Sequence, residues 1–401
     1  MTAIITTQKK NKLIVQKYGG ATLATPEKIK QVALRIHNLH QTGTQVVVVV
    51  SAMGQTTNQL IELARNVSPN PHLRELDMLL TVGERISMSL LSMALNDLGS
   101  NAISFTGSQA GILTDDSHVN ASIIDVKAFR VEEALKENKI VILAGFQGVS
   151  PQTKEITTLG RGGSDTSAVA MAAYLNADRC EILKDVDAVF TADPKLVPQA
   201  KALHELHYEH LQEMTKWGAK VLHHKSVDMA LLKKVPLYVG SAANENINGT
   251  LITGYPSLLP KSFLAVNSYS TVFEIKSSVQ DAEEVQKEFL NFLTKNQIGA
   301  VEILCLSENT FFIAGPKENL DLIEQLNFSD SKFALLENAL CSVSITCFAT
   351  PTTEQKRLVT EKLKTAGIAT GCLQLSEKNI NFIIHQENQN QTIQLLHALI
   401  D

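Results

Sequence analysis

The sequence predicts an α/β protein with a mainly parallel sheet sandwiched by helices, followed by two small α+β modules of ferredoxin-like order. Over residues 13–250, short β-branched runs alternate with helical patterns, which is typical of βαβ units and a parallel sheet. The unbroken run Val46–Val50 suits a strand that is buried on both faces. Beyond residue 254 the order becomes strand, helix and two strands, and it then repeats.

The elements of the first region follow from apolar periodicity. The predicted strands are 13–18, 45–51, 102–106, 139–146 and 179–184, and the predicted helices are 26–40, 74–98, 129–138 and 164–176. Ser164 stands at the start of the last helix and is a residue type that caps helix N-termini.

Glycine usage marks the boundary between the two regions. Of the 21 glycines, 17 lie in 1–254 and 4 in 255–401, and the segment 254–260 has the two prolines of a linker. We predict a first domain over 1–254, a first module over 255–335 and a second module over 336–401. One irregular α+β domain is the alternative for the last two.

Composition excludes several classes of protein. Hydrophobic residues make up 44% and charged residues 19%, as in soluble globular proteins. The net charge of -5 lacks the basic footprint of a nucleic-acid binder. The longest strongly apolar run, Val46–Val50, is too short to span a membrane, and residues 1–12 lack an apolar signal core. We expect a cytoplasmic protein without nucleic-acid or membrane partners.

The five cysteines are scattered and never form a C-x-x-C pair, which favours neither a disulfide framework nor a zinc site. We expect free thiols in a reducing cytosol. They are Cys180, Cys305, Cys341, Cys347 and Cys372. The His204, His207 and His210 series drifts around a helix, so no metal site is predicted.

Two glycine clusters stand at predicted strand ends. Gly19 and Gly20 follow Lys17, and glycines there let backbone N–H groups approach phosphate oxygens. The following helix N-terminus adds positive potential, and a lysine suits a phosphate. A plain turn with a surface lysine is the alternative.

The second cluster runs from Thr158 to Asp165 and surrounds Arg161 with three glycines. This arrangement is a backbone concavity with a fork-shaped cation, which can grip a carboxylate through two hydrogen bonds. Asp165 also suits the first turn of a helix for purely structural reasons.

Carboxylates supply two further candidates. Glu84 lies early in a long helical stretch, where it either receives an ammonium group or is a solvated helix charge. Asp185 and Asp187 follow a strand, at the position where open α/β sheets bind ligands.

Eight blocks in order resemble the bacterial aspartate kinases of the amino acid kinase superfamily, over nearly all of residues 13–254. They are KYGG (17–20), VVVVSAMGQTTNQL (47–60), LLTVGERIS (79–87), SFTGSQAGI (104–112), AGFQGV (144–149), TTLGRGGSDTSAVA (157–170), CEILKDVDAVFTADPKLVPQA (180–200) and GAKVLHHKSV (218–227). The C-terminal third resembles the paired ACT modules of those enzymes in element order and in LQLSEKNINFIIHQ (373–386).

The resemblance implies an enzyme that phosphorylates the β-carboxylate of L-aspartate with MgATP, in lysine and threonine biosynthesis. It implies that Lys17 and Asp165 are catalytic, with no metal site of the protein's own. Its aspartate-binding positions match Thr57, Glu84, Arg161, Gly162, Gly163 and Ser164. Its ATP-binding positions match Lys17, Gly19, Gly20, Ala21, Lys184, Asp185, Phe190, Asp193, Lys195 and Lys220. It also implies a homodimer or larger assembly through the ACT-like modules.

Several residues depart from the family pattern. Ala21 stands where Thr or Ser is usual, Lys184 where a small hydroxyl residue is usual, and Lys195 and Gly240 where arginine is common. Loops 277–281 and 348–352 lack the glycine of effector-binding ACT modules, so we expect weak or absent feedback by lysine or threonine. A non-catalytic paralogue acting as a regulatory subunit, or a kinase for another amino-acid carboxylate, remains the alternative.

Overall fold

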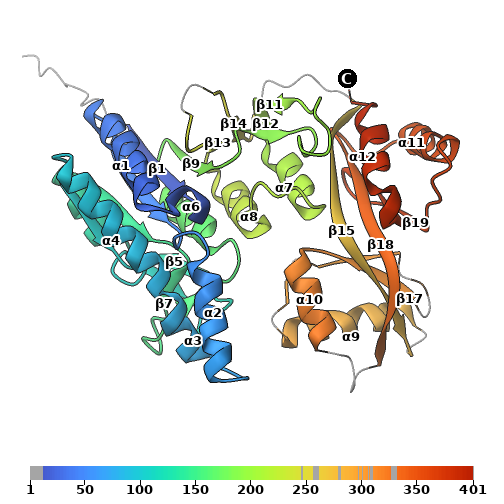
Figure 1. The fold of residues 1–401 in the computed structure, drawn as a ribbon, viewed down its shortest axis with the longest axis horizontal. Coiled ribbons are helices and arrows are strands. Elements are labelled where there is room, and N and C mark those ends of the chain that lie inside the picture. Colours follow the sequence, from blue (N-terminus) through green and yellow to red (C-terminus); the bar gives the residue numbers. More distant parts are fainter. Residues whose placement is uncertain are drawn as a thin grey trace, which may run out of the picture. The chain divides into compact units, whose positions relative to one another are not determined.

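The computed structural model describes residues 12–244, 247–255, 262–278, 281–296, 298–299, 301–305, 307, 310–326 and 332–400. The chain forms two compact units (Figure 1). Unit 1 comprises Met1–Ala188 and Lys225–Gly254, and unit 2 comprises Val189–His224 and Tyr255–Asp401. One junction therefore coincides with the boundary predicted at 254, whereas 189–224 belongs with the C-terminal region. Most of the predicted linker and the first eleven residues lie outside the described residues.

The main sheet of unit 1 is mostly parallel, as predicted. Its strands in this unit follow the order β14-β13-β9-β1-β2-β6-β3. Their bounds are β14 Thr250–Thr253, β13 Leu237–Ser241, β9 Arg179–Lys184, β1 Leu13–Tyr18, β2 Gln45–Val50, β6 Ile140–Ala144 and β3 Ala102–Phe105. All neighbours are parallel except β13 and β14. The carboxyl ends of β9, β1, β2 and β6 therefore meet at one edge of the sheet.

Helices cover both faces of this sheet. On one face α1 (Pro26–Gln41) and α4 (Val82–Asp97) pack beside each other on a core that includes Tyr18 (Figure 1). Strand side chains alternate between faces, so Lys17 belongs to the opposite face, where α6 (Gly163–Leu175) contacts β1, β2 and β9. This alternation decides which charged side chains meet at the end of β1.

Two parts of unit 1 were not predicted. The expected helix 74–98 is two helices, α3 (Leu73–Leu80) and α4, separated at Thr81. A second sheet has the order β5-β4-β7-β8, from β5 Ile123–Val126, β4 Ile112–Thr114, β7 Gln147–Val149 and β8 Ile156–Thr158. These strands have only three or four residues each, which leaves little alternation to detect, although the four-residue β3 was predicted. Helices α2 (Thr56–Val67), α5 (Phe129–Lys136) and α8 (His224–Lys233) complete the helical part.

Among the described residues, the stretch Leu73–Asp97 is long and apolar enough to cross a membrane, but half of its most apolar window is buried inside the fold. A core helix of a soluble protein passes the same test, so this stretch is weak evidence for a membrane span.

The sheet of unit 2 has the order β16-β17-β15-β18-β20-β19. The strands are β15 Phe263–Ser277, β16 Glu302–Leu304, β17 Thr310–Ala314, β18 Phe333–Cys347, β19 Cys372–Leu375 and β20 Asn379–His385. The helices are α9 Ala282–Lys295, α10 Lys317–Gln325, α11 Thr353–Thr365 and α12 Gln389–His397. The predicted order, repeated twice, is therefore present.

The two modules share their long strands. Strand β17 pairs with the second half of β15, and β20 pairs with the second half of β18, while β15 and β18 pair along most of their length. Each half of the sheet thus has the order expected of one module, but β18 crosses the boundary predicted at 335/336. A sequence pattern shows that a strand alternates, but not with which neighbours it pairs.

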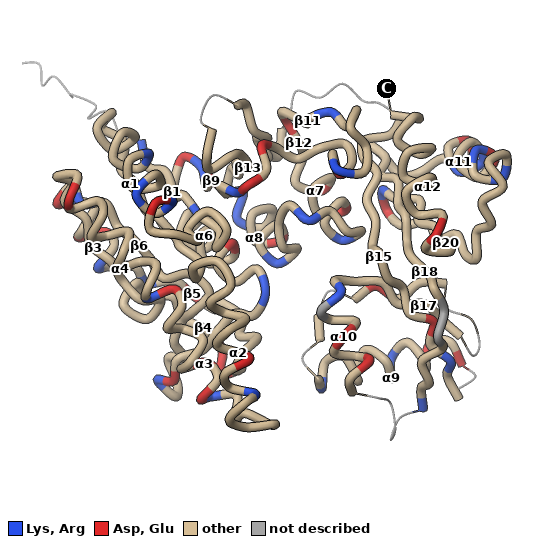
Figure 2. Tube along the Cα trace, viewed as in Figure 1, with Lys and Arg blue, Asp and Glu red and all other residues tan. Residues whose placement is uncertain are grey.

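Residues 189–224 join unit 2 through its core. They contain β10 (Val189–Phe190), β11 (Ala202–Leu203), β12 (Glu205–His207) and α7 (Tyr208–Lys216). Ala192 and Val197 lie in the same apolar cluster as residues of β18 and β20. Charges of both signs are interspersed along the helices of both units (Figure 2).

The expectation of five free thiols is wrong for two of them. Cys305 and Cys372 form a disulfide, with their Cα atoms 6.4 Å apart and a sequence separation of 67. Only the folded sheet brings the end of β16 near the start of β19. Cys180, Cys341 and Cys347 are free and buried.

Candidate active site

Three charged side chains meet at the carboxyl edge of the main sheet. Lys17 is the last residue but one of β1, Lys184 ends β9 and Asp165 lies in the first turn of α6. The Lys17 Nζ atom is 2.6 Å from Asp165 Oδ1, and Lys184 Nζ is 3.6 Å from Asp165 Oδ2. Burial lowers the pKa of Lys184, while the charge of Asp165 opposes that shift. Two ammonium groups share one carboxylate, so this group of side chains attracts a further anion.

The turn before α6 depends on glycine. Gly160 and Gly162 both have φ of +70°, and Gly162 occupies the N-cap position. The prediction that Ser164 caps this helix is therefore wrong, because the helix begins at Gly163 and Ser164 lies within its first turn. A Cβ at Gly163 would lie 2.8 Å from Leu159 Cβ, so no side chain fits there. Arg161 stands between the two left-handed glycines and is exposed.

The turn after β1 also depends on close backbone approach. A Cβ at Gly20 would lie 2.7 Å from the carbonyl oxygen of Ala52, and the Gly54 N–H donates to the Gly20 carbonyl at 3.0 Å. At Gly19 the nearest atom to a Cβ would be Lys17 Nζ, at 3.7 Å. The hydroxyl of Thr22 donates to the Gly19 carbonyl at 2.6 Å, so it does not replace the hydroxyl that Ala21 lacks.

Glu84 is buried rather than solvated. Its side chain belongs to α4, with 3% of the residue exposed, and Oε1 accepts from the Ala52 N–H at 3.0 Å. Its Oε2 atom has no hydrogen-bond partner among the described residues. Burial raises the pKa of Glu84 to about 7, against the opposing effects of the Ala52 N–H and the charge of Lys17. A buried carboxylate with one open oxygen suits a cationic ligand.

The remaining predicted residues are distributed between the units. Thr57 is half-buried in the first turn of α2, and Asp185 is exposed after β9. Unit 2 holds Phe190, Asp193, Lys195 and Lys220, of which the last three are exposed. Their nucleotide-binding role stays a prediction. The described residues include no group of three or more His, Cys, Asp or Glu arranged to hold a metal ion.

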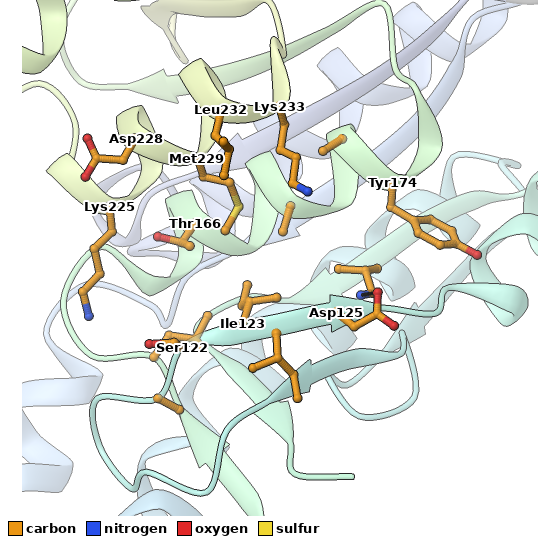
Figure 3. Close-up of a pocket in the computed structure, with 16 residues that line it drawn as sticks. Ser122, Ile123, Asp125, Thr166, Tyr174, Lys225, Asp228, Met229, Leu232 and Lys233 are labelled. Atoms are coloured by element: carbon orange, nitrogen blue, oxygen red, sulfur yellow. Dashed lines mark hydrogen bonds between the residues drawn. The ribbon is translucent and has the colours of Figure 1, made fainter. Parts of the chain in front are cut away.

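A cavity of about 620 Å³ lies in unit 1 between β5, α6 and α8 (Figure 3). Lys225 stands at one end, and Tyr174 and Asp125 stand toward the other (Figure 3). The Lys225 ammonium donates to Asn120 Oδ1 at 2.6 Å. Thr166, next to Asp165, lines this cavity, so it borders the start of α6.

Sequence reasoning missed residues that act through their backbone. Ala52 donates its N–H to Glu84 and abuts Gly20 with its carbonyl, and a Cβ at Gly83 would meet Ala52 Cβ at 2.7 Å. Gly145 approaches Ser164 in the same way, with a distance of 2.8 Å from its Cβ position to Ser164 Cβ. Small residues directly after buried strands were the available signal.

The arrangement places positive charge at the ends of β1 and β9, and the Glu84 carboxylate beside Ala52, which follows β2. Lys17 and Lys184 suit a phosphate, Glu84 suits an ammonium group, and Arg161 stands at the start of α6 together with Asp165. These groups can hold two small reactants, one anionic and one zwitterionic.

Comparisons with known proteins show the family to which the chain belongs. The model of the amino acid kinase family matches residues 12–241. The aspartokinase of Corynebacterium glutamicum is 55% identical over 248 residues, which cover 62% of this chain and 59% of that protein. The chain spans about three-fifths of the length of the first curated relatives it matches, from 57% to 61%.

One relative matches along its whole length. The aspartokinase of a Bacillus species (strain MGA3) is 37% identical, and the match covers 97% of each chain. Among solved structures, the aspartate kinase from Synechocystis is 33% identical with a TM-score of 0.55, covering 96% of this chain and 69% of that chain.

The structure of Escherichia coli aspartokinase III in complex with aspartate and ADP supports the fold alone. It is 23% identical, with a TM-score of 0.78, and covers 97% of this chain and 100% of that chain. The match of the family model and the full-length relative together show that the chain belongs to the amino acid kinase family, and within it to the aspartokinases.

Proposed function

We propose that this chain is an aspartate kinase, which transfers the γ-phosphoryl group of ATP to the β-carboxylate of L-aspartate. The observation that carries the proposal is the group of buried Lys17, buried Asp165 and half-buried Lys184 at the carboxyl edge of the sheet, beside α6, which follows the turn that bears Arg161. The curated relatives named aspartokinase, one of which matches along its whole length, support the choice of substrate.

Aspartate carries three charged groups, and the site offers a partner for each. Glu84 is the partner for the ammonium, because its Oε2 atom is open and buried. Arg161 is the partner for the α-carboxylate, with the N–H groups of Gly162 and Ser164 and the hydroxyl of Thr57 as further donors. Gly163 shapes the turn, because its N–H donates to the Gly160 carbonyl at 3.0 Å. The β-carboxylate is then left for Lys17.

The reaction needs no general base, because the β-carboxylate is already ionised at neutral pH. A carboxylate oxygen forms a bond to the γ-phosphorus, the bond from that phosphorus to the bridging β–γ oxygen breaks, and ADP leaves with the bond's electrons. Lys17 lowers the barrier by neutralising phosphoryl charge, and Asp165 holds the lysine in place. Positioning supplies the rest of the rate enhancement.

In unit 1, ATP binds as substrate through the turn at Gly19, Gly20 and Ala21 and through Lys184 and Asp185. The nucleotide-binding role of Phe190, Asp193, Lys195 and Lys220, which belong to unit 2, is carried by the family resemblance alone. Because Asp165 is already paired with two lysines, it is not a metal ligand of the resting protein. Mg²⁺ would come bound to the nucleotide phosphates and would supply charge screening there.

Feedback by lysine or threonine is weak or absent in this proposal. Loop 348–352 has no glycine and is held at both ends, because Phe348 accepts from His210 Nε2 at 3.0 Å and Thr352 forms a capping box with Gln355. Residues 279 and 280 of loop 277–281 lie outside the described residues. Calorimetry with each amino acid tests this part, and tight binding at millimolar concentration or below would contradict it.

The cellular setting follows from the same activity. The enzyme acts in the cytoplasm in lysine and threonine biosynthesis, as a homodimer or larger assembly formed through the ACT-like modules. Sedimentation of the full chain tests the assembly, and a monomer at micromolar concentration would overturn it.

A hydroxamate assay tests the function directly, because hydroxylamine traps acyl phosphates. Purified full-length chain is incubated with MgATP and aspartate, glutamate or N-acetylglutamate. We expect turnover with aspartate alone. Turnover of another substrate would identify a related carboxylate kinase, and ATP binding without turnover would identify a non-catalytic regulatory subunit.

A further inference from the structure

A buried carboxylate outside the candidate site connects the two elements that are expected to bind aspartate. Asp77 lies on α3, is fully buried, and is seven residues before Glu84. Its Oδ1 accepts from the Thr158 hydroxyl at 2.6 Å and from the Val119 N–H at 3.0 Å. Its Oδ2 accepts from His118 Nδ1 at 2.6 Å. Buried carboxylates with this many partners hold segments in a fixed geometry.

The partners of Asp77 belong to two segments that adjoin the Arg161 turn: the end of β8, and residues 118–121. Thr158 ends β8 three residues before Arg161, and its carbonyl accepts from the Ala121 N–H at 2.8 Å. The Val119 carbonyl lies 3.1 Å from the Cβ position of Gly160, and Asn120 Oδ1 lies 3.0 Å from it. The segment 118–121 therefore forms the support on which the turn rests.

This support is itself strained. Val119 has φ of +68°, a conformation that β-branched residues rarely adopt, and its N–H is bonded to Asp77. The carboxylate thus stabilises a backbone conformation that the local sequence disfavours. Without it, segment 118–121 is free to relax and Gly160 loses its contact surface.

The backbone of Asp77 also contacts the segment that leads to Glu84. The Asp77 carbonyl accepts from the Thr81 N–H at 3.1 Å, at the break between α3 and α4. Gln147 Nε2 donates to the Thr81 carbonyl at 3.2 Å, and Glu84 follows one turn later. Asp77 therefore stands between the element that holds Glu84 and the turn that holds Arg161.

We propose that Asp77, with Thr158 and His118, is a positioning group that fixes the spacing between Glu84 and the Arg161 turn and thereby sets the affinity for aspartate. The inference rests on the proposed function, because it assigns the ammonium of aspartate to Glu84 and its α-carboxylate to Arg161. It predicts a selective loss: aspartate binding weakens, whereas nucleotide binding at the turn after β1 does not.

The first experiment measures steady-state kinetics of the full-length Thr158→Val variant, which is isosteric but cannot donate to Asp77. We expect the KM for aspartate to rise about tenfold or more, as for a small misplacement of a binding group, while the KM for ATP changes less than about twofold. Thr158→Ser keeps the hydroxyl and should retain near wild-type values. Asp77→Asn should raise the KM for aspartate in the same selective way.

Glu181 supplies a matched control. It is also a buried carboxylate of unit 1, and among the described residues its hydrogen bonds and ion pair go to Gln16 and Arg179 rather than to the Arg161 turn. Glu181→Gln should lower stability without a selective rise in the KM for aspartate. An unchanged KM for aspartate in Thr158→Val and Asp77→Asn, an equal rise in both KM values, or the same rise in Glu181→Gln would overturn the proposal.

Hydrogen exchange separates this proposal from the proposed function. In Thr158→Val, the amides of residues 159–163 should exchange faster than in the wild type, while those of β1 do not change. If the wild type does not phosphorylate aspartate, the proposed function fails and the exchange result alone decides whether Asp77 orders the turn. Unchanged exchange at 159–163 would refute the positioning role in either case.

Discussion

Each unit buries a carboxylate among polar partners, but the two arrangements differ. In unit 2, Glu213 Oε2 on α7 accepts from Asn379 Nδ2 at 2.6 Å and from the Ser376 hydroxyl at 3.3 Å, and Thr346 donates to Asn379 Oδ1 at 2.8 Å. In this network, α7 and the sheet of unit 2 supply each other's hydrogen-bond partners. In unit 1, Glu84 keeps an oxygen without a partner, and two lysines share Asp165.

The difference separates a structural network from a binding site. A buried polar group without a partner costs stability, so its presence at the ends of parallel strands indicates a place kept for a ligand. A carboxylate whose partners are all supplied by the protein stabilises the fold instead. Substitutions of the candidate site residues of unit 1, such as Lys17 and Arg161, should therefore change activity, whereas those around Glu213 should change stability.

The largest effect is expected at Lys17. Lys17→Ala should lower kcat by about 10³-fold, because the charge that neutralises the phosphoryl group is lost. Steady-state kinetics measures the loss of activity, and a urea unfolding curve measures any loss of stability. If the loss of activity is explained by a loss of folded protein, Lys17 stabilises the fold, as Glu213 does, rather than the reaction.

Arg161→Ala should act on binding. We expect the KM for aspartate to rise about tenfold to a hundredfold, as for the loss of one or two charge-assisted hydrogen bonds, with a smaller change in kcat. The same hydroxamate assay over a range of aspartate concentrations measures it. An unchanged KM for aspartate would argue against the carboxylate-binding role.

Glu213→Ala should act on stability. It leaves the Asn379 amide and the Ser376 hydroxyl without their acceptor, so unfolding should become easier by roughly 1–3 kcal/mol. Urea denaturation measures the change, and kcat per folded molecule should stay near the wild-type value. A lower kcat at unchanged stability would remove the contrast between the two units.

The smallest effect concerns pH. Burial raises the pKa of Glu84 to about 7, so the free protein carries the neutral acid below that pH and loses the charge that attracts the ammonium of aspartate. The KM for aspartate should therefore fall as pH rises, by roughly tenfold between pH 6 and pH 8, as the carboxylate ionises. Glu84→Gln should have a high KM that is independent of pH in this range. A wild-type KM that does not vary would show that Glu84 does not face the ammonium.

The raised pKa of Glu84 should also make stability depend on pH: aspartate binding improves as pH rises, whereas the free energy of unfolding falls. Because the folded protein binds more protons than the unfolded chain between the ordinary pKa of 4.5 and about 7, this contribution to stability is present below 4.5 and lost as pH rises through about 7. Unfolding curves of the wild type and Glu84→Gln across this range measure it.

The sequence by itself determined the elements and turns that depend on near neighbours. Strands β1 and β9 have the predicted bounds, and the ends of α1 and α6 lie within one residue of theirs. The glycines around Lys17 and Arg161 could be placed at strand ends because turn chemistry is local. The exact start of α6 could not be predicted. Ser164 was expected at the N-cap position, but Gly162 occupies it in a left-handed conformation.

Tertiary structure decided which distant groups meet. Asp77 and Thr158 are 81 residues apart, Cys305 and Cys372 are 67 apart, and β18 pairs with strands of both modules. Whether Glu84 is solvated or buried also depended on the segment at Ala52 that covers it. Periodicity and turn residues report interactions within a few positions of the chain, whereas the partner of a buried polar group depends on the packing of whole elements.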